Sequence, residues 1–271
     1  TYEIILTEIN NMTSSSIFFK YEAKCLWGIA HSYRHEGINY ALAESYYKDS
    51  IQSAHKTNQK SIVLKCHFEL ATIYILQNNL SAANTELSLI NDIFKTLPSD
   101  QYIYTRIAYK KVYARYIRVF NIDGKDDLNL LKSVLNEYEK QKKRLQYNTF
   151  FDIGEHYRHH EQYTEAIENY SIALNFSLKN HDINLATMSR LGLVLCDICL
   201  KKSTPATVHI LQNILQECID NHLYTNKIIA KLIIDIIQHN ILSEETQNSL
   251  KYLGINFNNT EASFHYIDAN K

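Results

Sequence analysis

The stretch FFDIGEHYRHHEQYTEAIENYSIAL, residues 150–174, decides how the rest of the chain is interpreted. It holds three histidines beside several glutamates, so it suggests either a site of chemistry or a piece of scaffold. Small and aromatic residues also stand in a fixed order within it, at offsets of 3, 12, 16 and 19 from the first: Gly154, Tyr157, Ala166, Tyr170 and Ala173. That order favours a scaffold, because it returns elsewhere in the chain.

The same spacing occurs in three further places. These copies are Ala71, Tyr74, Ala83, Leu87 and Ile90; Ala30, Tyr33, Ala43 and Tyr47; and Gly192, Leu195, Thr204, Val208 and Leu211. The copy that begins at Ala30 has a one-residue slip in its loop, and the copy that begins at Gly192 has Thr where a small Ala is expected. Chance would rarely place four such patterns in register, so the chain is predicted to consist of repeats.

Helix packing explains why these residue types recur. Gly or Ala at the two small positions lets two antiparallel helices approach until their backbones nearly touch, and the larger residues fill the space beside that contact. The signature resembles the tetratricopeptide repeat (TPR), a helix–turn–helix unit with small and aromatic residues at these spacings. The resemblance implies an all-α fold, a right-handed α-solenoid built from antiparallel helix pairs.

The spacing between copies sets the expected organisation. The first positions of the four copies are 41, 83 and 38 residues apart, so a degenerate repeat is expected in the longest gap, near Val112. The predicted units are the end of a truncated preceding repeat over 1–17, repeats over 18–60, 61–99, 100–145, 146–182 and 183–222, a capping helix pair over 223–254 and a tail over 255–271. A period near 40 exceeds the ~34 residues typical of the family, which predicts long helices.

Composition agrees with a helical, soluble chain. Apolar residues make up 45% and charged residues 21% of the 271 residues, as in ordinary globular proteins. There are only six Gly and two Pro, which favours long helices with short loops over a β-sandwich with many tight turns. The net charge is −1, so the basic excess of a nucleic-acid-binding protein is absent and no nucleic-acid partner is expected.

The cysteines and the apolar segments indicate the compartment. Five cysteines do not form the even set of a disulfide framework, which suggests a reducing environment, and the lone Cys196-x-x-Cys199 pair has no second pair to complete a zinc site. The most apolar window, residues 228–237, is short and is interrupted by Lys231 and Asp235. We therefore expect a cytoplasmic protein without a membrane partner, and a chain that begins with Thr is expected to be part of a longer protein.

The histidines of the opening stretch are candidate metal ligands. His156 and His160 are four residues apart, and Glu155 or Glu161 could supply an oxygen ligand. The repeat register, however, ends the first helix near His159 and places His160 in the turn. The HExxH order of metalloproteases and Gly-rich phosphate loops are also absent. The expectation is therefore a non-enzymatic chain without catalytic residues, metal or cofactor, with a helical enzyme or metal-binding domain around His156 and His160 as the alternative.

The TPR resemblance implies a binding groove instead. In TPR folds the first helix of each pair lines the concave surface, and the register transfers its positions to residues of this chain. They are Lys24, Trp27, His31 and Arg34 in the first repeat, Lys65, Phe68 and Thr72 in the second, Arg106, Tyr109, Tyr113 and Tyr116 in the third, and Asn148, Phe151, Glu155, Arg158 and His159 in the fourth. These are mainly basic and aromatic residues, which dominate the energetics of protein interfaces. The alternative for each aromatic side chain is packing between long helices.

The expected function follows from the groove. The resemblance extends to the long-period TPR regions of bacterial STAND-type signalling ATPases and of Rap-type peptide-pheromone receptors. It implies a protein- or peptide-binding scaffold, the sensing region of a larger bacterial signalling or antiviral defence protein. A peptide-pheromone-binding domain of a transcriptional or phosphatase regulator is the closest alternative, and self-association through the terminal repeats is a further possibility for the partner.

Overall fold

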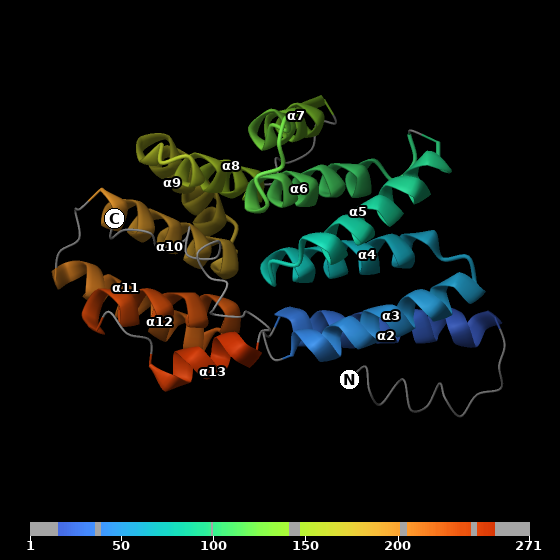
Figure 1. The fold of residues 1–271 in the computed structure, drawn as a ribbon, viewed down its shortest axis with the longest axis horizontal. Helices are drawn as coiled ribbons and strands as arrows, with labels where there is room; N and C mark the ends of the chain where they lie inside the picture. The colour runs from blue at the N-terminus through green and yellow to red at the C-terminus, as the bar shows by residue number, and fades with distance from the viewer. Residues whose placement is uncertain are drawn as a thin grey trace. The chain divides into compact units, whose positions relative to one another are not determined.

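The computed structural model describes residues 16–35, 39–98, 100–140, 147–200, 205–239 and 243–252. Every regular element in these residues is an α-helix, which confirms the all-α class (Figure 1). The twelve helices are α2 (Ser16–His35), α3 (Tyr40–Lys56), α4 (Lys60–Leu76), α5 (Leu80–Lys95), α6 (Ile103–Val119), α7 (Asp127–Lys140), α8 (Asn148–His159), α9 (Tyr163–Lys179), α10 (Ile183–Cys199), α11 (Pro205–Asp220), α12 (Tyr224–His239) and α13 (Glu244–Tyr252). The predicted tail and nearly all of the predicted unit over 1–17 lie outside the described residues.

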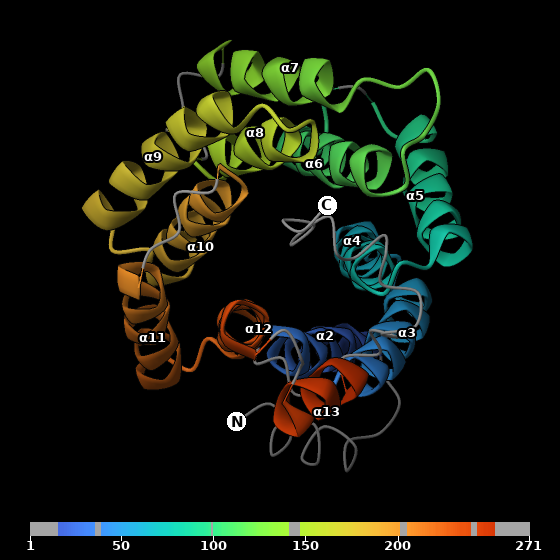
Figure 2. The ribbon, with the colours of Figure 1, turned by 60° about the vertical axis from the view of Figure 1, so that its left-hand side comes forward.

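The helices pack with their neighbours in the sequence. The chain divides into two compact units whose boundary falls inside α6, between Val112 and Tyr113. In the first unit α2 packs on α3, α3 on α4 and α4 on α5, while α2 also contacts α4. In the second unit α9 packs on both α8 and α10, α11 packs on α12, and α10 contacts both α8 and α12 (Figure 2). Within each unit, therefore, the first helices of successive pairs contact one another and form one layer.

One type of tight turn joins many of these helices. At its centre a non-glycine residue adopts a left-handed backbone conformation, with φ between 48° and 59°. The next backbone N–H bonds to a carbonyl five residues earlier, as from Gln59 to Ala54, Asn79 to Tyr74 and Gln162 to Tyr157. The central residues of these turns are Asn58, Asn78, Asn121, Glu161, His181 and His222. This is the Schellman closure of a helix, usually made with glycine, and it satisfies carbonyls that the helix end leaves unpaired.

Side-chain caps start three of the helices, two of them directly after such a turn. The side-chain oxygens of Asn39, Asn79 and Asp182 accept hydrogen bonds from the backbone N–H three residues later, at 2.9, 3.1 and 3.0 Å. Each such cap satisfies one of the unpaired N–H groups in the first turn of a helix. Short polar residues therefore both end one helix and begin the next, which allows connections of three residues with very few glycines.

Tyr170 on α9 is the central core residue of the second unit. Its side chain is fully buried, and Gly154 of α8 and Gly192 of α10 face its ring. A Cβ added to Gly154 would lie 2.8 Å from ring carbons of Tyr170, and one added to Gly192 would lie 2.7 Å away. The glycines therefore make room for an aromatic ring. The sequence had instead suggested that they let the backbones of two helices approach each other closely. The ring fills the space that the two missing side chains leave.

The first unit has a tyrosine in the corresponding position. Tyr47 of α3 is fully buried, as are the small residues Ala30 on α2 and Ala71 on α4. Its hydroxyl is buried without a hydrogen-bond partner, and burial raises the pKa of Tyr47. The hydroxyl of Tyr170, by contrast, donates to the carboxylate of Glu155. The rings of both tyrosines thus fill the core of their unit, but only the hydroxyl of Tyr170 makes a hydrogen bond.

This difference gives a prediction about stability. Replacing Tyr47 with Phe removes a buried hydroxyl that makes no hydrogen bond, so the free energy of unfolding is expected to stay unchanged or rise by up to about 1 kcal/mol. The matched variant Tyr170→Phe removes a used hydroxyl and is expected to lose about 1–3 kcal/mol. Urea denaturation of both variants measures the effect. A loss of more than about 1 kcal/mol in Tyr47→Phe would show that its hydroxyl has a partner.

The last helix pair is held by a buried carboxylate. Asp235 of α12 accepts hydrogen bonds from the backbone N–H of Ser243 at 3.0 Å and from the side chains of Ser243 and Thr246 at 2.7 and 2.6 Å. The hydroxyl of Ser243 also accepts from the N–H of Thr246 at 3.3 Å, which caps α13. These contacts attach the short α13 to α12 through polar groups.

Candidate partner-binding surface

Five side chains from α2 and α4 meet on one surface of the first unit. We refer to them as the Trp27 cluster: Trp27, His31, Arg34, Lys65 and Glu69. The rings of Trp27 and His31 stack with centroids 4.9 Å apart and planes inclined by 21°. The ammonium group of Lys65 lies 5.0 Å from the centroid of the Trp27 ring, within the range of a cation–π interaction. Four of these residues were predicted to share a surface, and the structure brings them together.

Glu69 is the member that the sequence analysis missed. Its carboxylate pairs with the guanidinium of Arg34 at 2.7 Å and lies 3.8 Å from Nδ1 of His31. Burial lowers the pKa of His31 and outweighs the opposing effect of Glu69, so this imidazole is neutral at pH 7. Arg34 and Glu69 are only partly exposed, and their pairing therefore holds the cluster in one arrangement. A glutamate four residues after Lys65 on the same helical face was the available signal.

The indole N–H of Trp27 has no hydrogen-bond partner among the residues that the structure describes. Its nitrogen is almost inaccessible to solvent, although the whole side chain is only half-buried. A buried polar hydrogen without an acceptor costs roughly 1–3 kcal/mol. A bound group that displaced the covering side chains and supplied an oxygen to this N–H would recover part of that energy. The cluster therefore combines an aromatic ring, cationic side chains and one buried donor whose bonding capacity is unused.

Other predicted groove residues of the first unit hold the scaffold together. The guanidinium of Arg106 donates to four carbonyls around the end of α5, those of Phe94, Leu97, Pro98 and Gln101, at 3.0–3.2 Å. It also lies 4.5 Å from the centroid of the Phe94 ring. Arg106 therefore caps the C-terminal end of α5, where cations and donors are favoured. Lys24 is exposed on α2, with its ammonium 5.8 Å from the ring of Tyr21.

The predicted groove aromatics divide between the surface and the core. Phe68 is buried, and Tyr109 packs edge-on against both Phe68 and Phe94, with centroids 6.4 and 5.8 Å apart. In the second unit Tyr113 stacks on Tyr116 at 5.9 Å, and Tyr116 is itself buried. Thr72 is buried and donates to the carbonyl of Phe68 within its own helix. Packing between helices thus accounts for Phe68, while Tyr116 is buried beside Tyr113 of its own helix.

In the fourth repeat the predicted residues also divide. Asn148 is exposed, and His159 is partly exposed with its Nε2 3.0 Å from Oδ1 of Asn121. Phe151 is buried and lies 5.5 Å from Tyr170, centroid to centroid. Glu155 and Arg158 are only 5% and 6% exposed and belong to the interior of the unit. The two charged residues therefore act in the scaffold.

Glu155 and Arg158 form a buried ion pair. The guanidinium of Arg158 donates to both carboxylate oxygens of Glu155, at 3.3 and 3.0 Å, and the hydroxyl of Tyr170 adds a further hydrogen bond. Burial alone would raise the pKa of Glu155, but Arg158 and the hydroxyl of Tyr170 outweigh it and lower the pKa to about 2. The carboxylate is therefore charged at neutral pH. Its partners compensate for the loss of hydration, as a buried charge requires.

A second buried ionic network joins α6, α7 and α8. Arg118 donates to Oδ2 of Asp127 and to the backbone carbonyl of Asp152, both at 3.2 Å. Arg115 pairs with the carboxylate of Asp152 at 3.1 Å, and Nδ1 of His156 donates to Oδ1 of Asp127 at 2.7 Å. The sequence analysis identified only His156 among these. Asp127 opens α7 and is remote from α8 in sequence, so spacing alone could not pair them.

Among the residues that the structure describes, Asp127, His156 and His160 form a group that could hold a metal. One potential ligand atom from each lies within 4.8 Å of the others. The predicted helix end at His159 is confirmed, but His160 does not leave the face of His156. Its backbone N–H still bonds to the carbonyl of His156 at 3.1 Å, so the helical geometry continues for one more residue. The candidate oxygen ligand is Asp127, in place of the glutamates that the sequence suggested.

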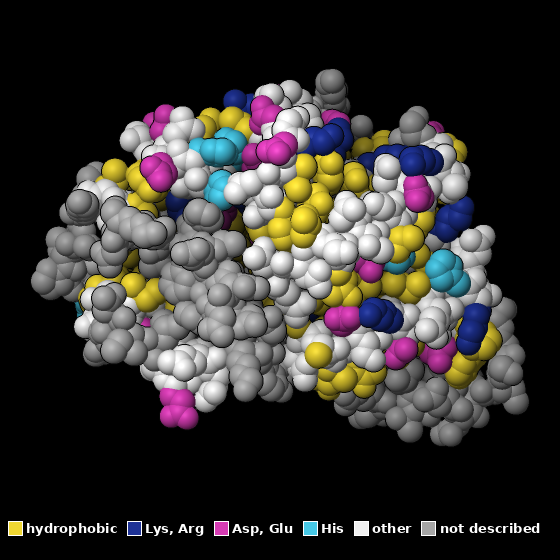
Figure 3. Space-filling model, viewed as in Figure 1, with side chains coloured by type: hydrophobic (Ala, Val, Ile, Leu, Met, Phe, Trp, Pro, Cys, Tyr) yellow, Lys and Arg dark blue, Asp and Glu magenta, His cyan; other side chains and the backbone are white. Residues whose placement is uncertain are grey.

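The cysteine thiols are poorly suited to nucleophilic chemistry. All five cysteines are free thiols; burial raises the pKa of Cys66, Cys196 and Cys218 to about 12, which makes them poor nucleophiles. Hydrophobic side chains on the face shown in Figure 3 are interspersed with polar and charged ones. Among the helices in the described residues, none has the length and apolar character to cross a membrane.

Comparisons with known proteins add no relative. No family model matches the chain, and no curated protein matches its sequence. The surfaces described above are therefore the basis for a proposed function.

Proposed function

We propose that this chain is a non-enzymatic TPR-like scaffold that binds a protein or peptide partner through the Trp27 cluster. The observation that carries the proposal is the half-buried Trp27, whose indole N–H has no partner and whose ring is flanked by His31 and Lys65. Trp and Arg are the residues most enriched at the energetic centres of protein interfaces. A flat aromatic surface with an unused donor suits the backbone of an extended peptide.

The charges of the surface favour an acidic partner. Lys65 and the nearby Lys24 are exposed cations, whereas Arg34 is already paired with Glu69 and His31 is neutral. The side chains at these positions therefore have two positive charges in excess. Carboxylates of a partner would interact favourably with the lysines, while its backbone carbonyl or an amide oxygen accepted the hydrogen bond of Trp27.

The repeat architecture supports the same class of function. First helices that contact one another across successive pairs, as α2 and α4 do, present a continuous row of side chains to a partner. We extend the proposal to a right-handed solenoid and to a sensing role in a larger signalling protein, because small rotations between repeats add along such an array. A pheromone-type peptide receptor is the narrower version of this proposal.

Selection from a library of displayed random peptides tests the proposal. Wild-type protein is expected to enrich acidic peptides, and Trp27→Ala is expected to weaken their binding by about tenfold or more, the effect of removing an interface anchor. Leu80→Ala is the matched control, because Leu80 is an exposed apolar residue of α5 outside the cluster, 46% exposed. It should bind the enriched peptides as the wild type does.

Two results would contradict the proposal. One is that no peptide is enriched over unrelated control protein. The other is that enriched peptides bind wild type and Trp27→Ala equally well while circular dichroism shows both proteins folded. In the second case a surface outside the Trp27 cluster would bind the peptides.

A further inference from the structure

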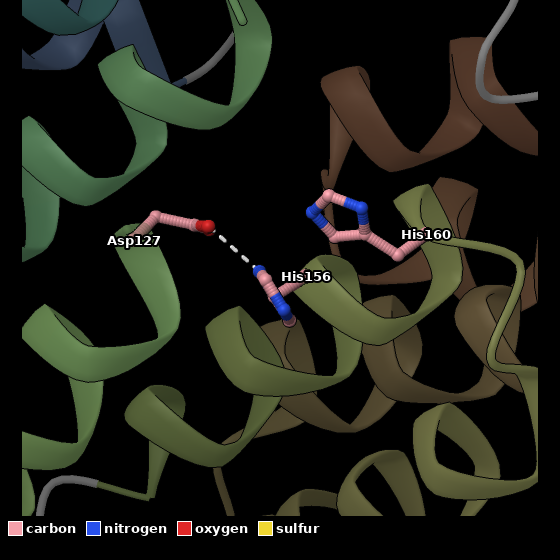
Figure 4. Close-up of side chains that lie close together, drawn as sticks. All are labelled: Asp127, His156 and His160. Atoms are coloured by element: carbon pink, nitrogen blue, oxygen red, sulfur yellow. Dashed lines mark hydrogen bonds and ion pairs between the residues drawn. The ribbon is translucent and has the colours of Figure 1, made fainter. Parts of the chain in front are cut away.

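Three side chains converge where the start of α7 meets the end of α8. Figure 4 shows Asp127 at the beginning of α7 and His156 and His160 at the C-terminal end of α8, all directed toward one another. Asp127 and His156 are buried and His160 is exposed. They belong to the same compact unit, so their approach is a property of that unit. The Trp27 cluster, in the other unit, makes no use of them.

The distances suit one small cation after modest side-chain rotation. Potential ligand atoms of the three residues lie within 4.8 Å of one another, and the rings of His156 and His160 have centroids 4.4 Å apart. A tetrahedral zinc ion with bonds of about 2.0–2.1 Å to nitrogen holds its ligands roughly 3.3 Å apart. Oδ1 of Asp127 and Nδ1 of His156 are now 2.7 Å apart across a hydrogen bond, so the cation would separate them slightly.

Neighbouring groups hold the carboxylate in position. Arg118 donates to Oδ2 of Asp127 and thereby fixes the group with Oδ1 toward His156. Hydrogen bonds of this kind orient metal ligands and are a common feature of metal sites. The guanidinium charge also weakens attraction for a cation, so we expect moderate affinity and not that of a closed structural zinc site.

We propose that Asp127, His156 and His160 bind one divalent transition-metal ion, with Zn²⁺ the best fit. Two imidazoles and one carboxylate are a ligand set preferred by zinc and its neighbours over Mg²⁺ or Ca²⁺, which take oxygen ligands. The ion takes the place of the proton between His156 and Asp127, and the neutral ring of His156 then carries its proton on Nε2. The exposed side of His160 leaves room for water as a fourth ligand.

Binding would link two helices that lie far apart in the sequence. Because the metal binds the folded unit and not the unfolded chain, it is expected to stabilise the junction of α7 and α8. At a free concentration one hundred times the dissociation constant, the melting temperature should rise by about 5 °C or more. This second readout is independent of any activity.

Calorimetric titration of chelator-treated protein with ZnCl₂, and absorption spectra with Co²⁺, test the proposal. Wild type is expected to bind one equivalent, and His160→Ala to bind at least about tenfold more weakly and to lose the rise in melting temperature. His159→Ala is the matched control, because His159 is the adjacent histidine and bonds to Asn121 outside the three residues. It should bind zinc as the wild type does.

The variant Asp127→Asn tests whether the carboxylate takes part in metal binding or whether the two histidines bind the ion without it. It is expected to weaken zinc binding by about tenfold or more. The proposal is wrong if wild type binds no equivalent of Zn²⁺ or Co²⁺, or if binding survives unchanged in folded His160→Ala. Equal binding by folded Asp127→Asn would also contradict it. Since His160 is exposed, its replacement keeps the test decisive even if Asp127→Asn does not fold.

Discussion

Replacing Tyr170 with Ala is expected to lower the free energy of unfolding by about 3–5 kcal/mol, the range for deleting a large aromatic side chain from a core. The ring is fully buried and faces Gly154 and Gly192, neither of which has a side chain that could fill the cavity. The substitution also removes the hydroxyl that donates to Glu155. Urea denaturation followed by circular dichroism measures the loss.

Two variants separate the contributions. Tyr170→Phe keeps the ring and should lose only the hydroxyl's part, about 1–3 kcal/mol. Tyr224→Ala removes a tyrosine that is 37% exposed on α12 and should change stability little. If Tyr170→Ala were as stable as wild type, to within about 1 kcal/mol, α9 would not pack on the two glycines as described.

Replacing Arg158 with Met is also expected to lower the free energy of unfolding strongly. The carboxylate of Glu155 is buried and charged, since its pKa is held at about 2, and Arg158 donates to both of its oxygens. Removing the guanidinium leaves a buried charge without its main partner, a change that typically costs about 3–5 kcal/mol. Thermal and urea denaturation at neutral pH measure the expected loss.

A double substitution gives the control for this prediction. Glu155→Gln combined with Arg158→Met removes both charges, and it is expected to be more stable than Arg158→Met alone. A double variant no more stable than the single one would show that lost packing, and not the uncompensated carboxylate, causes the effect. The same result would show that Arg158 stabilises the fold through the packing of its side chain and not through its charge.

Much of the fold could be predicted from residue spacing. Consecutive packed helices with short connections follow from the repeated small and aromatic positions and from the scarcity of Gly and Pro, and most of the described helices have 16 or 17 residues. The type of turn could not be predicted, because left-handed Asn, His and Glu residues carry no sequence signal as strong as glycine. The role of Gly154 was also misjudged, since periodicity shows where space is needed but not which side chain fills it.

Residues of the candidate site could be predicted only where helical spacing places them on one face of a helix. Trp27, His31 and Arg34 recur at helical spacing on α2, and Lys65 follows on α4 by the same register, so one surface was foreseeable. Glu155 and Arg158 have the same register but lie inside, where they pair with each other and Glu155 accepts from Tyr170 of the next helix. Asp127 joins His156 through a tertiary contact, which no local pattern encodes.

The fluorescence of Trp27 tests the proposed binding surface most directly, because it is the single tryptophan of the chain. Titration with an acidic peptide enriched by the wild-type protein is expected to change the emission of Trp27 saturably. Lys65→Glu should require about tenfold or more peptide for the same change. A peptide that binds by calorimetry without altering the emission, or that binds Lys65→Glu equally well, would contradict binding at the Trp27 cluster.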